Sequence, residues 1–135
     1  MPVIPPGGSD NVDAPDDKWR ELLERAMQES DGENKDPYVT VLLMANGDIH
    51  VYKYSDYEAA ALKIIIQLKA SGCTKIKRMV HLWCGEALDL PSYALREAIL
   101  DLNEENYSAQ FLMRGHAKYR ICTVEQLMPK RNNIF

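Results

Sequence analysis

Two β-prone runs on either side of Asn46-Gly47 constrain the fold of this chain more than any other feature of its sequence. The runs are 38–45 (YVTVLLMA) and 48–54 (DIHVYKY). Asn-Gly between such runs is the strongest short signature of a β-hairpin, because a type I′ turn needs positive φ at both central residues. A two-residue turn sets Met44 opposite Ile49. We therefore predict a hairpin in which one face carries Val39, Val41, Leu43, Tyr52 and Tyr54.

Helical spacing and capping residues predict helices around this hairpin. Apolar residues recur every three or four positions in 16–30, and Asp16 can accept the free N–H groups at its start. Ser55-Asp56-Tyr57-Glu58 has the pattern of a capping box that opens a second helix, and Pro91 suits the start of a third. Further strands are predicted at 75–84, 108–114 and 117–123, with a short helix at 124–128.

The order of these elements is helix, two strands, helix, strand, helix, two strands and a short helix. It predicts a single α+β domain with about five mostly antiparallel strands and three main helices. We expect the domain to span 16–129. The segment 1–15, rich in Pro, Gly, Asp and Asn, is predicted as a flexible tail, and 130–135 as a frayed end.

The net charge and the cysteine content indicate which partners and which cellular compartment suit the chain. The net charge is −4, which argues against a domain whose whole surface binds nucleic acid. The three cysteines are widely spaced, no signal peptide precedes them, and no apolar segment is long enough for a membrane span. We therefore expect reduced thiols, a cytoplasmic location and no contact with a membrane.

Metal binding and catalysis find little support in the pattern of residues. His81 and Cys84 are three apart, which places them on opposite faces of a strand, and C-x-x-C and H-x-x-x-H are absent. We expect no metal and no cofactor. Cys84 with His81 as base and Glu86 nearby could form a catalytic site, but a core thiol beside Trp83 is the favoured explanation of Cys84. No catalytic residue is assigned, and nothing in the sequence identifies an enzyme.

A basic and aromatic sheet face is a second candidate for function. Lys77, His81 and Trp83 alternate on one face of the predicted strand 75–84, and Arg78 and Arg120 add positive charge nearby. Such a face can stack unpaired bases and hold phosphates. The alternative is an ordinary solvated sheet surface on which long basic side chains cover aromatic rings.

The tyrosine-rich face of the hairpin is the third candidate. Tyr52 and Tyr54 with their apolar neighbours are typical of an interface core, although the first helix with Trp19 could cover them instead. We predict a small non-catalytic protein-interaction or regulatory module of unknown pathway, whose partner is another protein or a second copy. A nucleic-acid-binding domain is the alternative, and an enzyme with a Cys/His/Glu site is the third possibility. The candidate binding residues are Tyr52, Tyr54, Trp83, His81, Lys77, Arg78 and Arg120.

Overall fold

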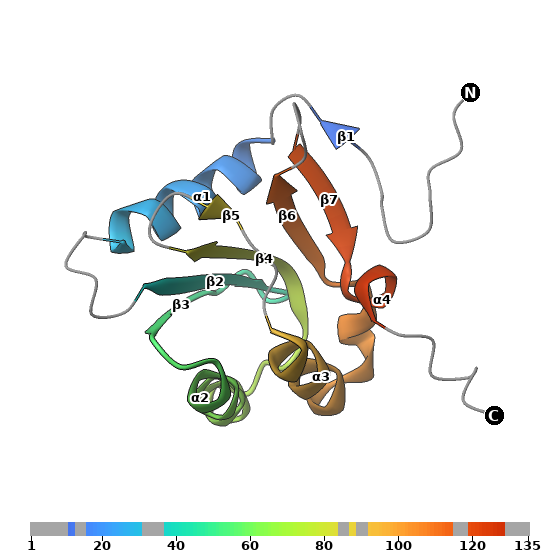
Figure 1. Cartoon of the computed structure of the whole chain (residues 1–135). Coiled ribbons are helices and arrows are strands. Elements are labelled where there is room, and N and C mark those ends of the chain that lie inside the picture. The colour runs from blue at the N-terminus through green and yellow to red at the C-terminus, as the bar shows by residue number, and fades with distance from the viewer. Residues whose placement is uncertain are drawn as a thin grey trace.

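A mixed β-sheet with helices on both faces forms the protein (Figure 1). The structure is a computed structural model and describes residues 11–12, 16–30, 37–83, 87–88, 92–114 and 119–128. Helix α1 (Asp17–Glu29) covers one face of the sheet, and α2 (Tyr57–Ser71) and α3 (Tyr93–Leu102) cover the other. The predicted single-domain α+β class and the predicted order of elements are confirmed.

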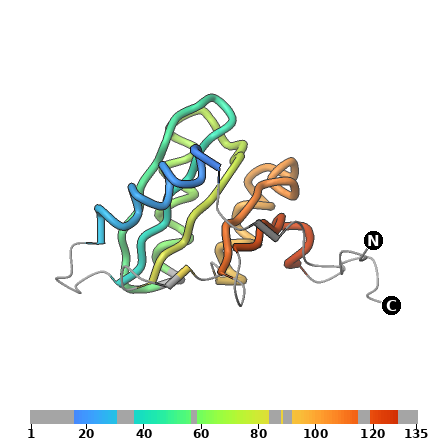
Figure 2. The backbone as a smooth tube through the Cα atoms, turned by 90° about the horizontal axis from the view of Figure 1, so that it is seen from above, coloured from blue at the N-terminus to red at the C-terminus, as the bar shows by residue number. Residues whose placement is uncertain are grey.

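Seven strands form the sheet within the described residues, in the order β1-β7-β6-β4-β2-β3 with β5 beside β4. Neighbouring strands are antiparallel except β4 and β6, because α3 and the 3₁₀ helix Glu104–Ser108 return the chain to the end of the sheet where β4 began. Figure 2 shows the described residues after 92 gathered beside β4, away from α1. The strands are β1 (Asn11–Val12), β2 (Tyr38–Met44), β3 (Ile49–Tyr54), β4 (Ile76–Trp83), β5 (Ala87–Leu88), β6 (Gln110–Arg114) and β7 (Tyr119–Thr123), followed by helix α4 (Val124–Leu127).

The segments expected as tails are only partly covered by this description. Strand β1 falls inside the segment 1–15 and pairs with β7 through Asn11 opposite Arg120. The remainder of 1–15, and all of 130–135, lie outside the described residues. Among the helices that the structure describes, none is long and apolar enough to cross a membrane.

The register of the β2–β3 hairpin differs from the prediction by one residue. The N–H of Met44 donates to the Asp48 carbonyl at 2.8 Å, and Gly47 adopts a φ of +95°, so the loop has three residues and ends in a left-handed glycine. The predicted two-residue turn was therefore wrong. Leu43 pairs with Ile49, and every partner shifts accordingly. The predicted single face divides: Val39, Val41 and Leu43 lie on the α1 side, and Tyr52 and Tyr54 on the α2–α3 side.

Helix α1 packs on the sheet through Trp19, Leu22 and Ala26, all at most 1% exposed. This confirms that α1 covers the valines of β2. The guanidinium of Arg78 on β4 lies 4.8 Å from the centre of the Trp19 ring and donates to Asp16 at 2.9 Å. Since Asp16 also caps α1 by accepting from the Trp19 N–H at 2.9 Å, one carboxylate links the start of the helix to the sheet.

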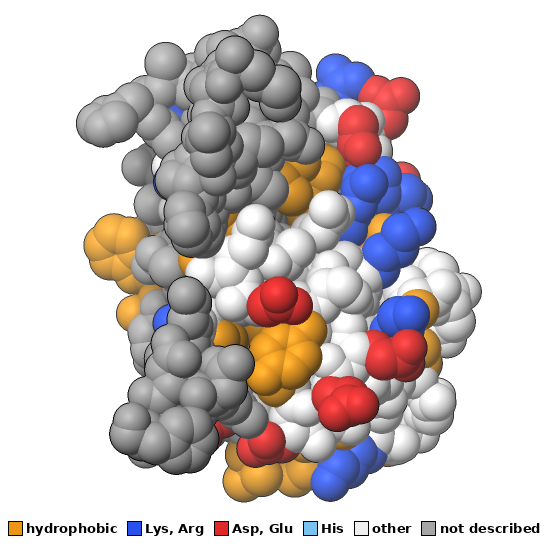
Figure 3. Space-filling view, turned by 90° about the vertical axis from the view of Figure 1, so that its right-hand side faces the viewer, with side chains coloured by type: hydrophobic (Ala, Val, Ile, Leu, Met, Phe, Trp, Pro, Cys, Tyr) orange, Lys and Arg blue, Asp and Glu red, His pale blue; other side chains and the backbone are white. Residues whose placement is uncertain are grey.

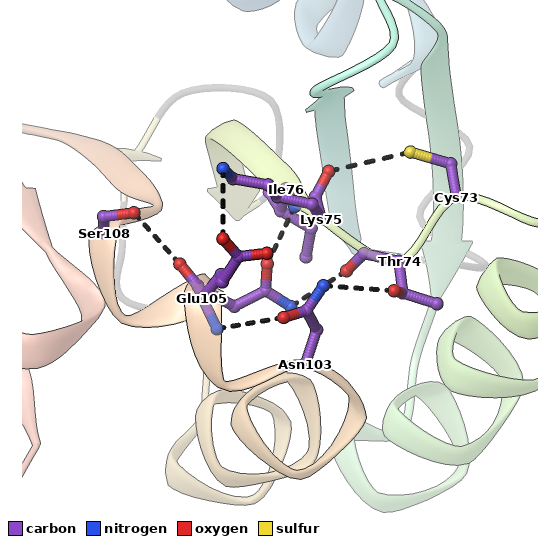
Figure 4. A network of polar contacts seen from close by, with 8 residues as sticks. Cys73, Thr74, Lys75, Ile76, Asn103, Glu105 and Ser108 are labelled. Carbon is purple, nitrogen blue, oxygen red and sulfur yellow. Dashed lines mark hydrogen bonds and ion pairs between the residues drawn. The ribbon is translucent and has the colours of Figure 1, made fainter.

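Asn106 orients the helices on the opposite face. Its side chain is fully buried, its Oδ1 accepts from the Ile76 N–H at 2.8 Å, and its Nδ2 donates to the carbonyls of Thr74 (3.0 Å) and Ile99 (2.8 Å). Asn103 adds a donor bond to the Thr74 hydroxyl (Figure 4). These bonds hold the end of α3 beside the start of β4. Helix α2 also ends just before β4, so both helices begin at the other end of the sheet.

Candidate functional site

Three aromatic residues form a row across the sheet at the end where β4 finishes. Tyr38 on β2 pairs with Tyr54 on β3 and with Trp83 on β4, and residues opposite each other in antiparallel strands share a face. The rings of Tyr38 and Tyr54 are stacked, with centres 5.6 Å apart. Tyr54 is buried, Tyr38 is half-buried, and Trp83 is 46% exposed. We call these residues the aromatic row.

A buried polar cluster supports the row from within the sheet. The Thr40 hydroxyl lies 2.6 Å from the Tyr54 hydroxyl and 2.8 Å from Nδ1 of His81, and the Tyr54 hydroxyl lies 3.1 Å from the same nitrogen. Thr40 and His81 are at most 1% exposed. Burial of the two hydroxyls and of Nδ1 of His81 is tolerated because they lie within hydrogen-bonding distance of one another. The His81 ring also stacks on Tyr38 at 5.8 Å, so this polar trio of Thr40, Tyr54 and His81 fixes both tyrosines of the row.

The starts of two helices lie at the same end of the sheet. Helix α2 begins three residues after Tyr54, and α3 is capped by the Ser92 hydroxyl, which accepts from the Leu95 N–H at 3.2 Å. The first turns of helices carry N–H groups without intrahelical partners and a partial positive charge. This end of the sheet therefore combines a partly exposed aromatic surface with the starts of two helices.

The predicted tyrosine strip is not an exposed surface. Tyr52 and Tyr54 are 4% and 7% exposed, and they face α2 together with Leu42 and Met44. Burial raises the pKa of the Tyr52 phenol, whose oxygen lies 3.4 Å from Nδ1 of His50. Of the two tyrosines, only Tyr54 belongs to the aromatic row. Its buried ring stacks on Tyr38.

The structure also does not assemble the predicted basic and aromatic face. His81 is buried, Arg78 is engaged beneath α1, and only Lys77 and Trp83 are exposed. Arg120 lies two strands away from β4, on β7. Figure 3 shows that acidic, basic and hydrophobic side chains are mixed on the described part of the face that looks out past β6 and β7. Of the proposed Cys84, His81 and Glu86 site, Cys84 and Glu86 lie outside the described residues.

Comparison with known proteins identifies the fold. No protein-family model and no curated protein matches the chain. Solved structures do match it: cytidine deaminase from Mycobacterium leprae superposes with a TM-score of 0.65 at 14% identity, covering 85% of this chain and 100% of that one. Cytidine deaminase from Mycobacterium tuberculosis gives 0.61 at 15% identity, covering 85% and 97%. The chain therefore shares its fold with cytidine deaminases.

This result overturns the predicted function. A non-catalytic protein-interaction or regulatory module was wrong, because the structures that share this fold are enzymes. The sequence contains no motif that leads to this correction. At 14–15% identity, the similarity lies in the arrangement of helices and strands rather than in shared residues.

The residues of this chain do not fit the zinc ion of zinc deaminases. That centre uses one His or Cys and two Cys ligands in an H-x-E and P-C-x-x-C signature, and a catalytic zinc needs three protein ligands. Here Pro91 is followed by Ser92 and, three residues later, Leu95 at the cysteine positions. The Ser92 hydroxyl caps α3, and Leu95 is 1% exposed in the core.

The H-x-E half of the signature does not supply the missing zinc ligands either. Triplets that begin with a possible metal ligand and end in Glu occur at 31–33 (DGE), 56–58 (DYE) and 84–86 (CGE), and each first residue could supply one ligand only. Among the described residues, no three His, Cys, Asp or Glu side chains are grouped so that they could hold a metal ion. We therefore derive no chemistry through zinc.

Proposed function

We propose that this protein binds a pyrimidine base or nucleoside at the aromatic row, without a zinc ion. The observation that carries the proposal is Trp83, 46% exposed beside Tyr38 at the end of the sheet where α2 and α3 begin. An aromatic side chain that stacks on a base contributes about 1–3 kcal/mol. The shared fold with proteins named as cytidine deaminases supports a ligand of this class.

Each part of the site has a distinct role in this proposal. Trp83 and Tyr38 stack on the ring of the ligand, and the partial positive charge at the starts of α2 and α3 favours its carbonyl oxygens. The polar trio positions Tyr38 through the stack on His81 and does not itself contact the ligand. Any reaction of the bound ligand would have to use the chain's own side chains, because the donors for a zinc-bound water are missing.

We also propose a cytoplasmic location for this activity. The thiols of Cys73 and Cys122 are free in the described part of the chain, and Cys122 is buried. Reduced thiols are typical of proteins in reducing compartments.

Substitution of Trp83 tests the site. Titration with cytidine, uridine or cytosine should quench the fluorescence of the wild-type protein, since Trp83 is 46% exposed and Trp19 is 1% exposed. Trp83→Ala, measured by calorimetry, should raise the Kd for that ligand at least about five-fold, because one stacking contact is lost. Met27→Ala on α1, which is also exposed, is the matched control and should leave the Kd unchanged.

Two results would contradict the proposal in different ways. If no pyrimidine base or nucleoside binds at millimolar concentration, the ligand class is wrong. If the purified protein carries one zinc ion per chain and releases ammonia from cytidine in a chelator-sensitive manner, binding stands and the zinc-free site is wrong.

A further inference from the structure

Thr40 lies fully buried in the middle of the sheet, on β2 between Tyr52 of β3 and His81 of β4. A valine has nearly the same shape and suits a strand as well. Burial of a hydroxyl is unfavourable unless new hydrogen bonds replace those to water. The contacts of this hydroxyl therefore decide what threonine contributes at this position that valine would not.

The hydroxyl of Thr40 connects the two rings that support Tyr38. It lies 2.6 Å from the Tyr54 hydroxyl and 2.8 Å from Nδ1 of His81. Tyr38 stacks on both of these rings, with centres 5.6 Å from Tyr54 and 5.8 Å from His81 and interplanar angles of 24° and 15°. Because one oxygen atom joins both supports, a change at Thr40 reaches Tyr38 from two sides.

The distances within the polar trio favour one arrangement of protons. Each hydroxyl can donate one hydrogen bond, whereas Nδ1 of a histidine either donates or accepts. The two contacts of Thr40 are shorter than the 3.1 Å contact between the Tyr54 hydroxyl and Nδ1 of His81. A phenol is a stronger acid than an alcohol, so the shortest contact is best explained by Tyr54 donating to Thr40. The proton of Thr40 is then available for Nδ1 of His81.

We propose that Thr40 is a positioning residue of the aromatic row. Tyr54 donates to Thr40, Thr40 donates to Nδ1 of His81, and the neutral His81 ring carries its proton on Nε2. These bonds hold the Tyr54 and His81 rings at the angles at which Tyr38 stacks on them, so Tyr38 is in place before a ligand arrives. The effect of Thr40 on affinity rests on the proposed binding of a pyrimidine base or nucleoside, whereas the arrangement of protons is a property of the free protein.

NMR of the ligand-free, ¹³C,¹⁵N-labelled full chain tests the arrangement of protons. Long-range ¹⁵N–¹H spectra distinguish a protonated from an unprotonated ring nitrogen, and we expect His81 to carry a proton on Nε2 and none on Nδ1. The ring signals of Tyr38 should shift in Thr40→Val, which has no hydroxyl, and stay near their wild-type positions in Thr40→Ser. A proton on Nδ1 would overturn the proposal, as would Tyr38 signals that Thr40→Val leaves unchanged.

Calorimetric titration with cytidine tests the effect on affinity. Thr40→Val should raise the Kd at least about three-fold, because part of a stacking contact is lost. Thr40→Ser should bind like the wild-type protein although it loses a buried methyl group. Val41→Ala, at a buried residue on the α1 side of the same strand, is the matched control for lost stability and should leave the Kd unchanged. Weaker binding by Thr40→Ser with normal binding by Thr40→Val would show that the shape of Thr40 matters and its hydroxyl does not.

A Tyr38→Ala background separates positioning from the other roles of Thr40. There Thr40→Val should not change the Kd further, since Thr40 acts through Tyr38, and equal effects in both backgrounds would overturn this role. If the wild-type protein binds no pyrimidine, the proposed function fails, while the spectra of the ligand-free protein still decide the arrangement of protons. Circular dichroism checks that each variant is folded.

Discussion

At the scale of single residues, Asn106 is a buried polar side chain that connects two elements of the fold. It joins the start of β4 to the end of α3 through three hydrogen bonds, and it is fully buried. A buried backbone group that loses its partner costs about 1–3 kcal/mol. The arrangement of the candidate site therefore depends on a residue at the opposite end of the sheet.

Replacement of Asn106 by Leu should lower the free energy of unfolding by at least about 2 kcal/mol, since the Ile76 N–H and two carbonyls lose their partner. Urea unfolding followed by circular dichroism measures this change. Asn103→Ala is the matched comparison: it removes one bond to Thr74 and one cap, and should cost about 1 kcal/mol. Equal costs for the two variants would show that Asn106 has no special role.

Tyr38 and Thr40 are residues of the site that sequence reasoning did not select. Neither belongs to a motif, and both were placed within the hairpin as ordinary strand residues. Their role depends on contact with His81, which is 41 residues from Thr40 in sequence. Only the pairing of β2 with β4 brings them together, and strand order could not be derived from the sequence.

At the scale of elements, the docking of α1 depends on Asp16 and Arg78. The hydrogen bond from Arg78 and the N–H of Trp19 lower the pKa of the Asp16 carboxyl. A carboxyl whose pKa is lower in the folded protein stabilises the fold above its unfolded pKa, and this contribution is lost as the pH falls through the folded pKa. Because Asp16 is largely exposed, solvent screens the pair and the gain is below about 1 kcal/mol.

Asp16→Asn tests this contact because asparagine keeps the cap and removes the charge. At pH 7 the variant should unfold at a lower urea concentration than the wild-type protein. The difference should shrink as the pH falls below about 4, the pKa of an unfolded carboxyl, and disappear only below the lowered pKa of the folded carboxyl. Glu24→Gln, on an exposed part of the same helix, is the control. A difference that persists unchanged at pH 3 would show that the charge of Asp16 is not its cause.

The positions of the helices and strands were largely predictable from the sequence. The side of the sheet on which each strand residue lies was less predictable. Periodicity and caps located α1, α2 and α3, because these signals are local. The hairpin was located but its register was wrong, since Asn-Gly fits both a two-residue loop and a three-residue loop. A further irregularity between Leu43 and Met44 in the β2–β4 pairing places Ile76 on the α2–α3 side, although alternation put it with Val80 and Leu82.

At the scale of the whole molecule, the fold class followed from the order of elements, whereas the relationship to enzymes did not. Identity of 14–15% with cytidine deaminases leaves no shared motif for a single sequence to reveal. Ser92 and Leu95 stand where a P-C-x-x-C signature has cysteines after its proline, so no zinc-deaminase signature was visible in the sequence. The chain therefore shares the fold of cytidine deaminases without this signature.

The most direct test of this account is an NMR titration of the chelator-treated, ¹⁵N-labelled full chain with cytidine, repeated after one equivalent of zinc is added. We expect shifts at the Trp83 indole, at Tyr38 and at the first turns of α2 and α3, with the same affinity in both titrations. Shifts that appear only after zinc is added would contradict a metal-independent site, and the absence of shifts in both titrations would contradict binding at the aromatic row.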